Sequence, residues 1–133
     1  MFEYHAWITI QHSAGDEDDA DLNAAYLRAE EELLPLQGDP SLVNLRWING
    51  MAQLHLSGFL NHRSGEGQNV IDAFYRIGAV AQGSYGVLYM LDDEDQGGKN
   101  NEFQVLVMRR GQVTQEEDHF FSPYIPLIED EEE

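Results

Sequence analysis

The chain has 133 residues, a length typical of one domain, and 25 Asp and Glu residues against seven Lys and Arg give it a formal net charge of −18. This charge repels phosphate backbones and anionic membranes, so nucleic acid and membranes are poor candidate partners, whereas a protein with a basic surface is attracted. The chain contains no Cys, which excludes disulfides and thiolate chemistry. With no signal-peptide pattern at its N-terminus and no apolar stretch near the ~20 residues of a membrane span, we expect a cytoplasmic protein.

The N-terminal third of the chain predicts a strand followed by a helix. From Phe2 to Gln11, apolar and polar residues alternate with the period of two that is typical of a strand. After an acidic loop at residues 16–19, apolar residues recur at helical spacing. We expect this helix to end at Leu34, because the residue before Pro35 is driven away from helical geometry.

Asn49-Gly50 is the strongest turn signal, because both central positions of a type I′ turn need positive φ. The two-residue turn sets the register of a hairpin in which Trp47 lies opposite Ala52 and Leu45 lies opposite Leu54. One face of the hairpin is then apolar and the other polar. We therefore predict that Trp47, Leu45 and Leu54 lie on the buried face.

The second half of the chain predicts another helix and further strands. A loop is expected over residues 61–68, and a helix follows from Val70 to Ala81, before Gly83. Residues 84–91 are predicted to form a strand, and residues 92–101 a polar loop. The last predicted strand runs over residues 103–110 and turns at Gly111.

This order of elements predicts an α+β protein with the βαββαβ pattern of ferredoxin-like folds, in which both helices pack on one face of an antiparallel sheet. An added C-terminal hairpin is expected at the end. Beyond Phe120, Pro123 and Pro126 disfavour regular structure. We predict a single α+β domain over residues 1–128 and a solvated acidic tail over residues 129–133.

The sequence offers weak evidence for metal binding or catalysis. None of the five histidines lies in a ligand-spaced pair, and only a cross-strand pair of His5 and His55 leaves a zinc site open. Ser84 lies in a segment that resembles a nucleophile elbow, but the segment has Gln82 at the first glycine position and runs from helix to strand. We therefore predict no catalytic, cofactor-binding or metal-binding residues.

A protein-binding edge is the better candidate site. An acidic segment follows a predicted strand that carries two tyrosines, and aromatic side chains beside charge are typical of interface anchors. A solvated acidic loop is the alternative interpretation. The candidate partner-binding residues are Asp92, Asp93, Glu94, Asp95, Tyr85, Tyr89 and Phe121.

Several segments together resemble a family of immunity proteins found beside bacterial polymorphic toxins and contact-dependent inhibition systems. The resemblance rests on Glu3 to Ile8, Leu56 to Arg63, Gly83 to Tyr89 with the acidic segment after it, and Phe120 to Pro126. It implies a cytoplasmic protein without catalysis or cofactor that binds a cognate toxin domain stoichiometrically and blocks it. From the residues alone, two alternatives stay open: a small enzyme with a carboxylate and His site, and an adaptor that acts through its sheet edge.

Overall fold

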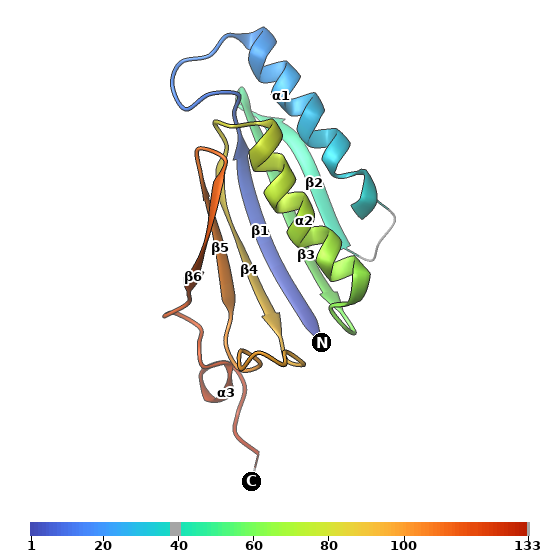
Figure 1. Ribbon diagram of the computed structural model, residues 1–133, viewed down its shortest axis with the longest axis vertical. Coiled ribbons are helices and arrows are strands. Elements are labelled where there is room, and N and C mark those ends of the chain that lie inside the picture. The colour runs from blue at the N-terminus through green and yellow to red at the C-terminus, as the bar shows by residue number, and fades with distance from the viewer. Residues whose placement is uncertain (38–40, 133) are drawn as a thin grey trace.

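The computed structural model describes residues 1–37 and 41–132, which form a six-stranded antiparallel sheet with three helices. The strands are β1 (Phe2–Ile10), β2 (Ser41–Ile48), β3 (Met51–Leu60), β4 (Tyr85–Asp92), β5 (Gln104–Arg109) and β6 (Gln112–Glu117). The helices are α1 (Asp19–Glu32), α2 (Ser64–Val80) and α3 (Tyr124–Leu127). Across the sheet the strands lie in the order β2-β3-β1-β4-β5-β6 (Figure 1).

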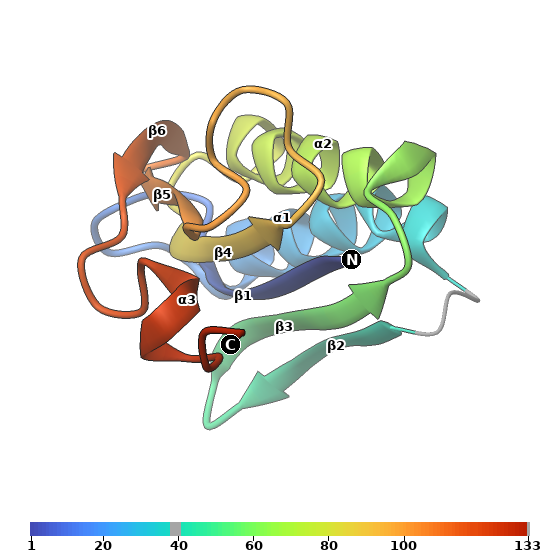
Figure 2. The ribbon, with the colours of Figure 1, turned by 90° about the horizontal axis from the view of Figure 1, so that it is seen from below.

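Strand β1 lies inside the sheet, between β3 and β4, and its alternation decides the two faces. Its even-numbered residues, from Phe2 to Ile10, are buried. Helices α1 and α2 cover this inner face, while α3 lies on the opposite, outer face (Figure 2). The α2 residues Phe74 and Ile77 and the α1 residues Ala25 and Ala29 complete the core. The predicted first strand is therefore confirmed.

The register predicted from Asn49-Gly50 is confirmed: Trp47 pairs with Ala52 and Leu45 pairs with Leu54. Leu54 is fully buried, Leu45 is half-buried, and Trp47 lies on the same predicted face, opposite the buried Ala52, although 38% of Trp47 stays exposed. The physical reason is position, because β2 is an edge strand with no further strand beyond it. Trp47 instead stacks on Tyr26 of α1, with ring centroids 4.8 Å apart.

The predicted helix boundaries need correction at two places. Helix α1 ends at Glu32, two residues before the predicted end at Leu34. Residues 34–36 then form one 3-10 turn, which accepts Pro35 near its start. Helix α2 begins at Ser64, inside the segment predicted as a loop. Gly67 is buried in this first part of α2, where an added Cβ would lie 3.1 Å from the Phe2 ring. The glycine there permits close packing of helix against strand.

The predicted hairpin at Gly111 is present as β5 and β6. Arg110 and Gly111 both have positive φ (50° and 71°), as a two-residue turn of this hand requires. The turn also packs tightly against α2, since a Cβ on Gly78 would lie 2.4 Å from the Gly111 carbonyl oxygen. The Gly111 N–H donates to the carbonyl of Ser84 (2.8 Å), which ties the hairpin to the start of β4.

The segment after β6 is largely irregular, as Pro123 and Pro126 predict: its short helix α3 has four residues, and Ile125 within it has non-helical dihedral angles (φ −102°, ψ 119°). Residues 129–132 are exposed, as expected for an acidic tail, and Glu133 lies outside the described residues. Across residues 1–37 and 41–132, no helix combines the length and the apolar character that a membrane span requires.

Candidate functional site

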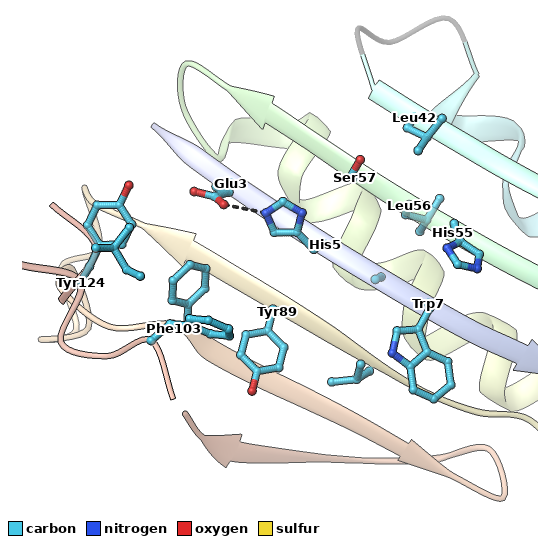
Figure 3. Close-up of a pocket in the computed structure, with 14 residues that line it drawn as sticks. Glu3, His5, Trp7, Leu42, His55, Leu56, Ser57, Tyr89, Phe103 and Tyr124 are labelled. Atoms are coloured by element: carbon cyan, nitrogen blue, oxygen red, sulfur yellow. Dashed lines mark hydrogen bonds and ion pairs between the residues drawn. The ribbon is translucent and has the colours of Figure 1, made fainter. Parts of the chain in front are cut away.

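The outer face of the sheet carries a groove with a volume of about 660 Å³. Glu3, His5 and Trp7 lie in a row along β1 on this face, because they alternate with the buried residues of the same strand (Figure 3). Neighbouring strands add the residues that pair with them: His5 is flanked by Ser57 on β3 and Tyr89 on β4. The groove is lined by Glu3, His5, Ala6, Trp7, Leu42, His55, Leu56, Ser57, Val87, Tyr89, Phe103, Phe121, Tyr124 and Ile128.

The carboxylate of Asp118 builds one wall of the groove by fixing the chain directly after β6. It accepts the N–H groups of Phe120 (2.9 Å) and Phe121 (3.0 Å) and the hydroxyls of Ser122 (2.7 Å) and Tyr89 (3.3 Å). Asp118 is only 7% exposed. Burial alone would raise the pKa of Asp118, but the four hydrogen bonds stabilise its ionised form and hold the pKa below the usual range.

Asn101 and Ser122 fix the rest of this wall. The Asn101 amide donates to the carbonyl of Ile125 (3.1 Å) and accepts the N–H of Ile125 (2.9 Å), while its backbone carbonyl accepts the N–H of Tyr124 (2.8 Å). The Phe103 N–H donates to the hydroxyl of Ser122 (2.8 Å). The C-terminal segment, residues 118–128, is therefore held against the sheet through side chains that the sequence pattern did not single out.

The two tyrosines of the groove stay neutral near neutral pH. Burial, followed by the negative charge of Asp118, raises the pKa of Tyr89, which is consistent with its phenol donating to that carboxylate. Burial also raises the pKa of Tyr124, with further contributions from the charges of Glu3, Glu129 and Asp93. One end of the groove therefore lies in a negative electrostatic environment.

His5, Glu3 and Ser57 lie close together on the outer face but do not form a site for nucleophilic chemistry. Glu3 Oε2 lies 2.6 Å from His5 Nε2, and Ser57 is the residue opposite His5 on β3. Among the described residues, however, no hydrogen bond joins Ser57 to His5. A serine nucleophile depends on a base within hydrogen-bond reach, so this arrangement lacks the contact that would activate it.

The cross-strand pair of His5 and His55 does not form part of a metal-ligand group within the described ranges. His55 lies opposite Trp7, and His5 lies opposite Ser57, so the two imidazoles are offset along the strands (Figure 3). Ser84 is fully buried, and its hydroxyl accepts the Gln11 N–H (3.1 Å). It therefore supports the start of β4.

Two of the four predicted acidic residues shape their own loop. Asp92 is buried, and its carboxylate accepts the N–H of Glu94 (3.1 Å). The Asp95 carboxylate accepts the N–H groups of Gly97 (2.9 Å) and Lys99 (3.0 Å). These hydrogen bonds leave Asp92 and Asp95 in structural roles within the loop after β4.

Asp93 and Glu94 are the exposed members of the acidic segment. The N-terminal ammonium of Met1 lies 2.6 Å from Asp93 Oδ1 and 3.6 Å from Glu94 Oε1, and its pKa is raised, mainly by the hydrogen bond to Asp93. His62 Nδ1 lies 2.6 Å from Glu94 Oε1, and this contact lowers the pKa of Glu94. Carboxylate oxygens of Asp92, Asp93 and Glu94 lie within 4.8 Å of one another, a set that a hard cation could join.

The three predicted aromatic residues lie on the same outer face. Tyr89 and Phe121 both line the groove, with ring centroids 6.1 Å apart. Tyr85 is exposed, and its ring makes an edge-to-face contact with Trp7 at 6.0 Å, so Trp7 connects Tyr85 to the groove. The acidic segment follows directly at the end of the strand that carries Tyr85 and Tyr89.

Sequence reasoning missed most of the groove. A signal was available for His5 and Trp7, because the alternation of β1 predicts that they share the outer face. No local signal marks Phe103 or Tyr124, because both reach the groove through long-range hydrogen bonds of the C-terminal segment.

Comparison with known proteins identifies the family. The family model described as Immunity protein 7 matches residues 1–130 of the chain. No curated protein and no solved structure matches the chain. Because the match covers nearly the whole of the 133 residues, the chain belongs to the Immunity protein 7 family, a family of bacterial toxin immunity proteins.

Proposed function

We propose that the chain neutralises a bacterial toxin domain by binding it stoichiometrically through the outer face of the sheet. Family membership supplies a toxin as the partner and indicates a protein that is not an enzyme. One observation carries the choice of face: the helices α1 and α2 cover the inner face, while the outer face presents the groove.

Exposed aromatic side chains support this choice. Trp7, Tyr85 and Phe121 are each between 42% and 47% exposed, and all three lie on the outer face. Tryptophan and tyrosine are enriched among the residues that contribute most binding energy at protein interfaces, because they bury large areas at a small loss of conformational entropy. The toxin surface is then expected to cover the groove and these three side chains.

We further propose that the exposed carboxylates Asp93 and Glu94 guide a toxin with a basic surface toward this face. The support is the formal net charge of −18 and the position of both residues at the end of β4. Complementary charge raises association rates by steering the encounter, and this effect weakens as salt screens the charges. Asp92 and Asp95 act indirectly in this proposal, by holding the loop in shape.

The stoichiometric test uses the cognate toxin domain, for which the gene directly upstream is the first candidate to clone. Calorimetric titration should give a complex of one chain per toxin domain, and toxin activity should fall in proportion to the chain added. A toxin domain that stays fully active in the presence of excess folded chain would contradict the proposed function.

The steering test measures binding kinetics of Asp93→Asn and Glu94→Gln at low and high salt. Both variants should associate more slowly than the wild type at low salt, and the difference should shrink at high salt. Glu30→Gln is the matched control, because Glu30 is an exposed carboxylate on α1, which covers the inner face. Equal slowing by the control would mean that only the overall charge matters.

For the fold we propose the finer, ferredoxin-like assignment with one domain over residues 1–128. It is supported by the order β2-β3-β1-β4 of the first four strands, by the position of α1 and α2 on one face, and by one core that joins Phe2 to Met108. The cytoplasmic location and the exclusion of nucleic acid stay predictions from the sequence.

A further inference from the structure

Glu3 gives one end of the groove a distinctive chemistry. It is the only carboxylate among the residues that line the groove, and no Lys or Arg lines it in the described part of the chain. The Glu3 side chain is only 14% exposed, because it sits on β1 inside the sheet. Its Oε2 contacts His5 Nε2, and no hydrogen bond to Oε1 is present among the described residues.

Tyr124 lies beside this carboxylate and presents an aromatic surface to the groove (Figure 3). The charges of Glu3, Glu129 and Asp93 all act on its phenol. We use the name acidic end for Glu3, Tyr124, Asp93 and Glu129. The acidic end therefore combines negative charge with an aromatic wall.

If the toxin docks over the groove, the Glu3 carboxylate destabilises the complex unless the toxin supplies a partner for it. When a protein covers the groove, Glu3 loses the water that now reaches it, and a desolvated carboxylate destabilises the complex unless it is paired and hydrogen-bonded. One contact to His5 leaves acceptor capacity, since an ionised carboxylate has about four lone-pair sites. A hydrogen-bond donor that carries a positive charge meets both needs, because it fills a free lone pair and offsets the negative charge.

We propose, on the basis of the proposed function, that an arginine side chain of the toxin enters the groove and pairs its guanidinium with Glu3. A guanidinium matches this site better than an ammonium, because its planar fork donates to carboxylates and its face stacks on aromatic rings such as Tyr124. Its apolar stem packs against the groove wall, while the surrounding charges of Asp93 and Glu129 favour the cation.

The first test uses short peptides as probes of the wild-type chain. Blocked leucine–arginine–leucine is titrated while NMR follows the ring signals of His5 and Tyr124, and the same peptide with citrulline provides a neutral probe of nearly equal shape. The arginine peptide should shift both signals and bind about tenfold more tightly than the citrulline peptide, as expected for one charge-assisted hydrogen-bond pair. Equal affinity of the two peptides, or equal affinity of a lysine version, would overturn the proposal.

The second test uses Glu3→Gln, which keeps the size of the side chain and an acceptor for His5 but removes the charge. The preference for arginine over citrulline should disappear in this variant and persist in the matched control Glu30→Gln. Retention of the preference in Glu3→Gln would assign the cation to another carboxylate and overturn the proposal. The comparison of peptides on the wild-type chain stands even if the variant folds poorly.

The toxin domain separates this inference from the proposed function. The Glu3→Gln variant should bind the toxin at least tenfold more weakly than Glu30→Gln, with a faster dissociation rate. If the toxin binds wild type and Glu3→Gln equally, the arginine contact is wrong and the proposed function stands. If the toxin does not bind the wild type, the proposed function fails, whatever the peptides show.

Discussion

Replacing Asp118 with Asn removes the acceptor that holds the C-terminal wall of the groove. The carboxylate accepts four hydrogen bonds, two on each oxygen, and an amide keeps only one of these oxygens. Its NH₂ group would face two donors, such as the N–H of Phe121 and the hydroxyl of Ser122. A hydrogen bond to a charged group contributes about 1.5–3 kcal/mol, and water at these half-buried positions replaces part of the loss. We therefore expect the free energy of unfolding to fall by roughly 2–4 kcal/mol.

Urea unfolding at neutral pH measures this loss, with Asp130→Asn in the exposed tail as the control, for which a change below about 0.5 kcal/mol is expected. The pH dependence gives a second readout. The pKa of Asp118 is lowered by folding, so its contribution is present above the unfolded pKa of about 3.9 and is lost as pH falls through the folded pKa. The difference between wild type and Asp118→Asn should therefore stay constant above about pH 5 and narrow below about pH 4.

Amide hydrogen exchange locates the effect. In Asp118→Asn the N–H groups of Phe120 and Phe121 should exchange faster than in the wild type, because both donate to the lost carboxylate. An Asp118→Asn chain with unchanged stability and unchanged exchange at these two amides would refute the role of Asp118 in fixing the wall.

Two further predictions concern the core. Leu54→Ala should lower the free energy of unfolding by about 2–5 kcal/mol, because Leu54 is fully buried. Leu42→Ala is the control: Leu42 is 55% exposed on the neighbouring strand, so its replacement should change the free energy of unfolding by less than about 1 kcal/mol. Equal losses for the two variants in urea unfolding would contradict the assigned faces. Gly86→Ala should lower the thermal unfolding midpoint strongly, since an added Cβ would lie 2.1 Å from the Trp7 carbonyl oxygen and would force the backbones of β4 and β1 apart. A midpoint within 1–2 °C of the wild type would show that β4 and β1 can separate at little cost.

The sequence predicted those parts of the fold that depend on local patterns. The alternation of residues 2–11 predicts a strand, and the turn at Asn49-Gly50 predicts the register of the β2–β3 hairpin; both predictions are confirmed. The exposure of Trp47 could not be predicted from the same pattern, because it depends on β2 being at the edge of the sheet. The early start of α2 depends on the contact of Gly67 with Phe2, which lies 65 residues away in sequence.

The candidate site was harder to predict, for the same physical reason. Tyr85 and Tyr89 lie four residues apart on one strand, so the period of two predicts that they share a face. The structure places both on the outer face. Phe103 and Tyr124 reach the groove only because Asn101 and Ser122 make long-range hydrogen bonds that no local pattern encodes. The resemblance to immunity proteins predicted the family, which local patterns could not do, and the match to Immunity protein 7 over residues 1–130 confirms it.

A matched pair of tyrosine variants tests the central claim, that the toxin docks on the outer face of the sheet. Tyr85 on β4 and Tyr75 on α2 are 42% and 46% exposed, and they lie on opposite sides of the molecule. The affinity of Tyr85→Ala for the toxin domain should fall at least tenfold, as expected for an aromatic anchor, while Tyr75→Ala should bind as tightly as the wild type. A loss of affinity in Tyr75→Ala with none in Tyr85→Ala would place the toxin on the helical face and contradict the claim.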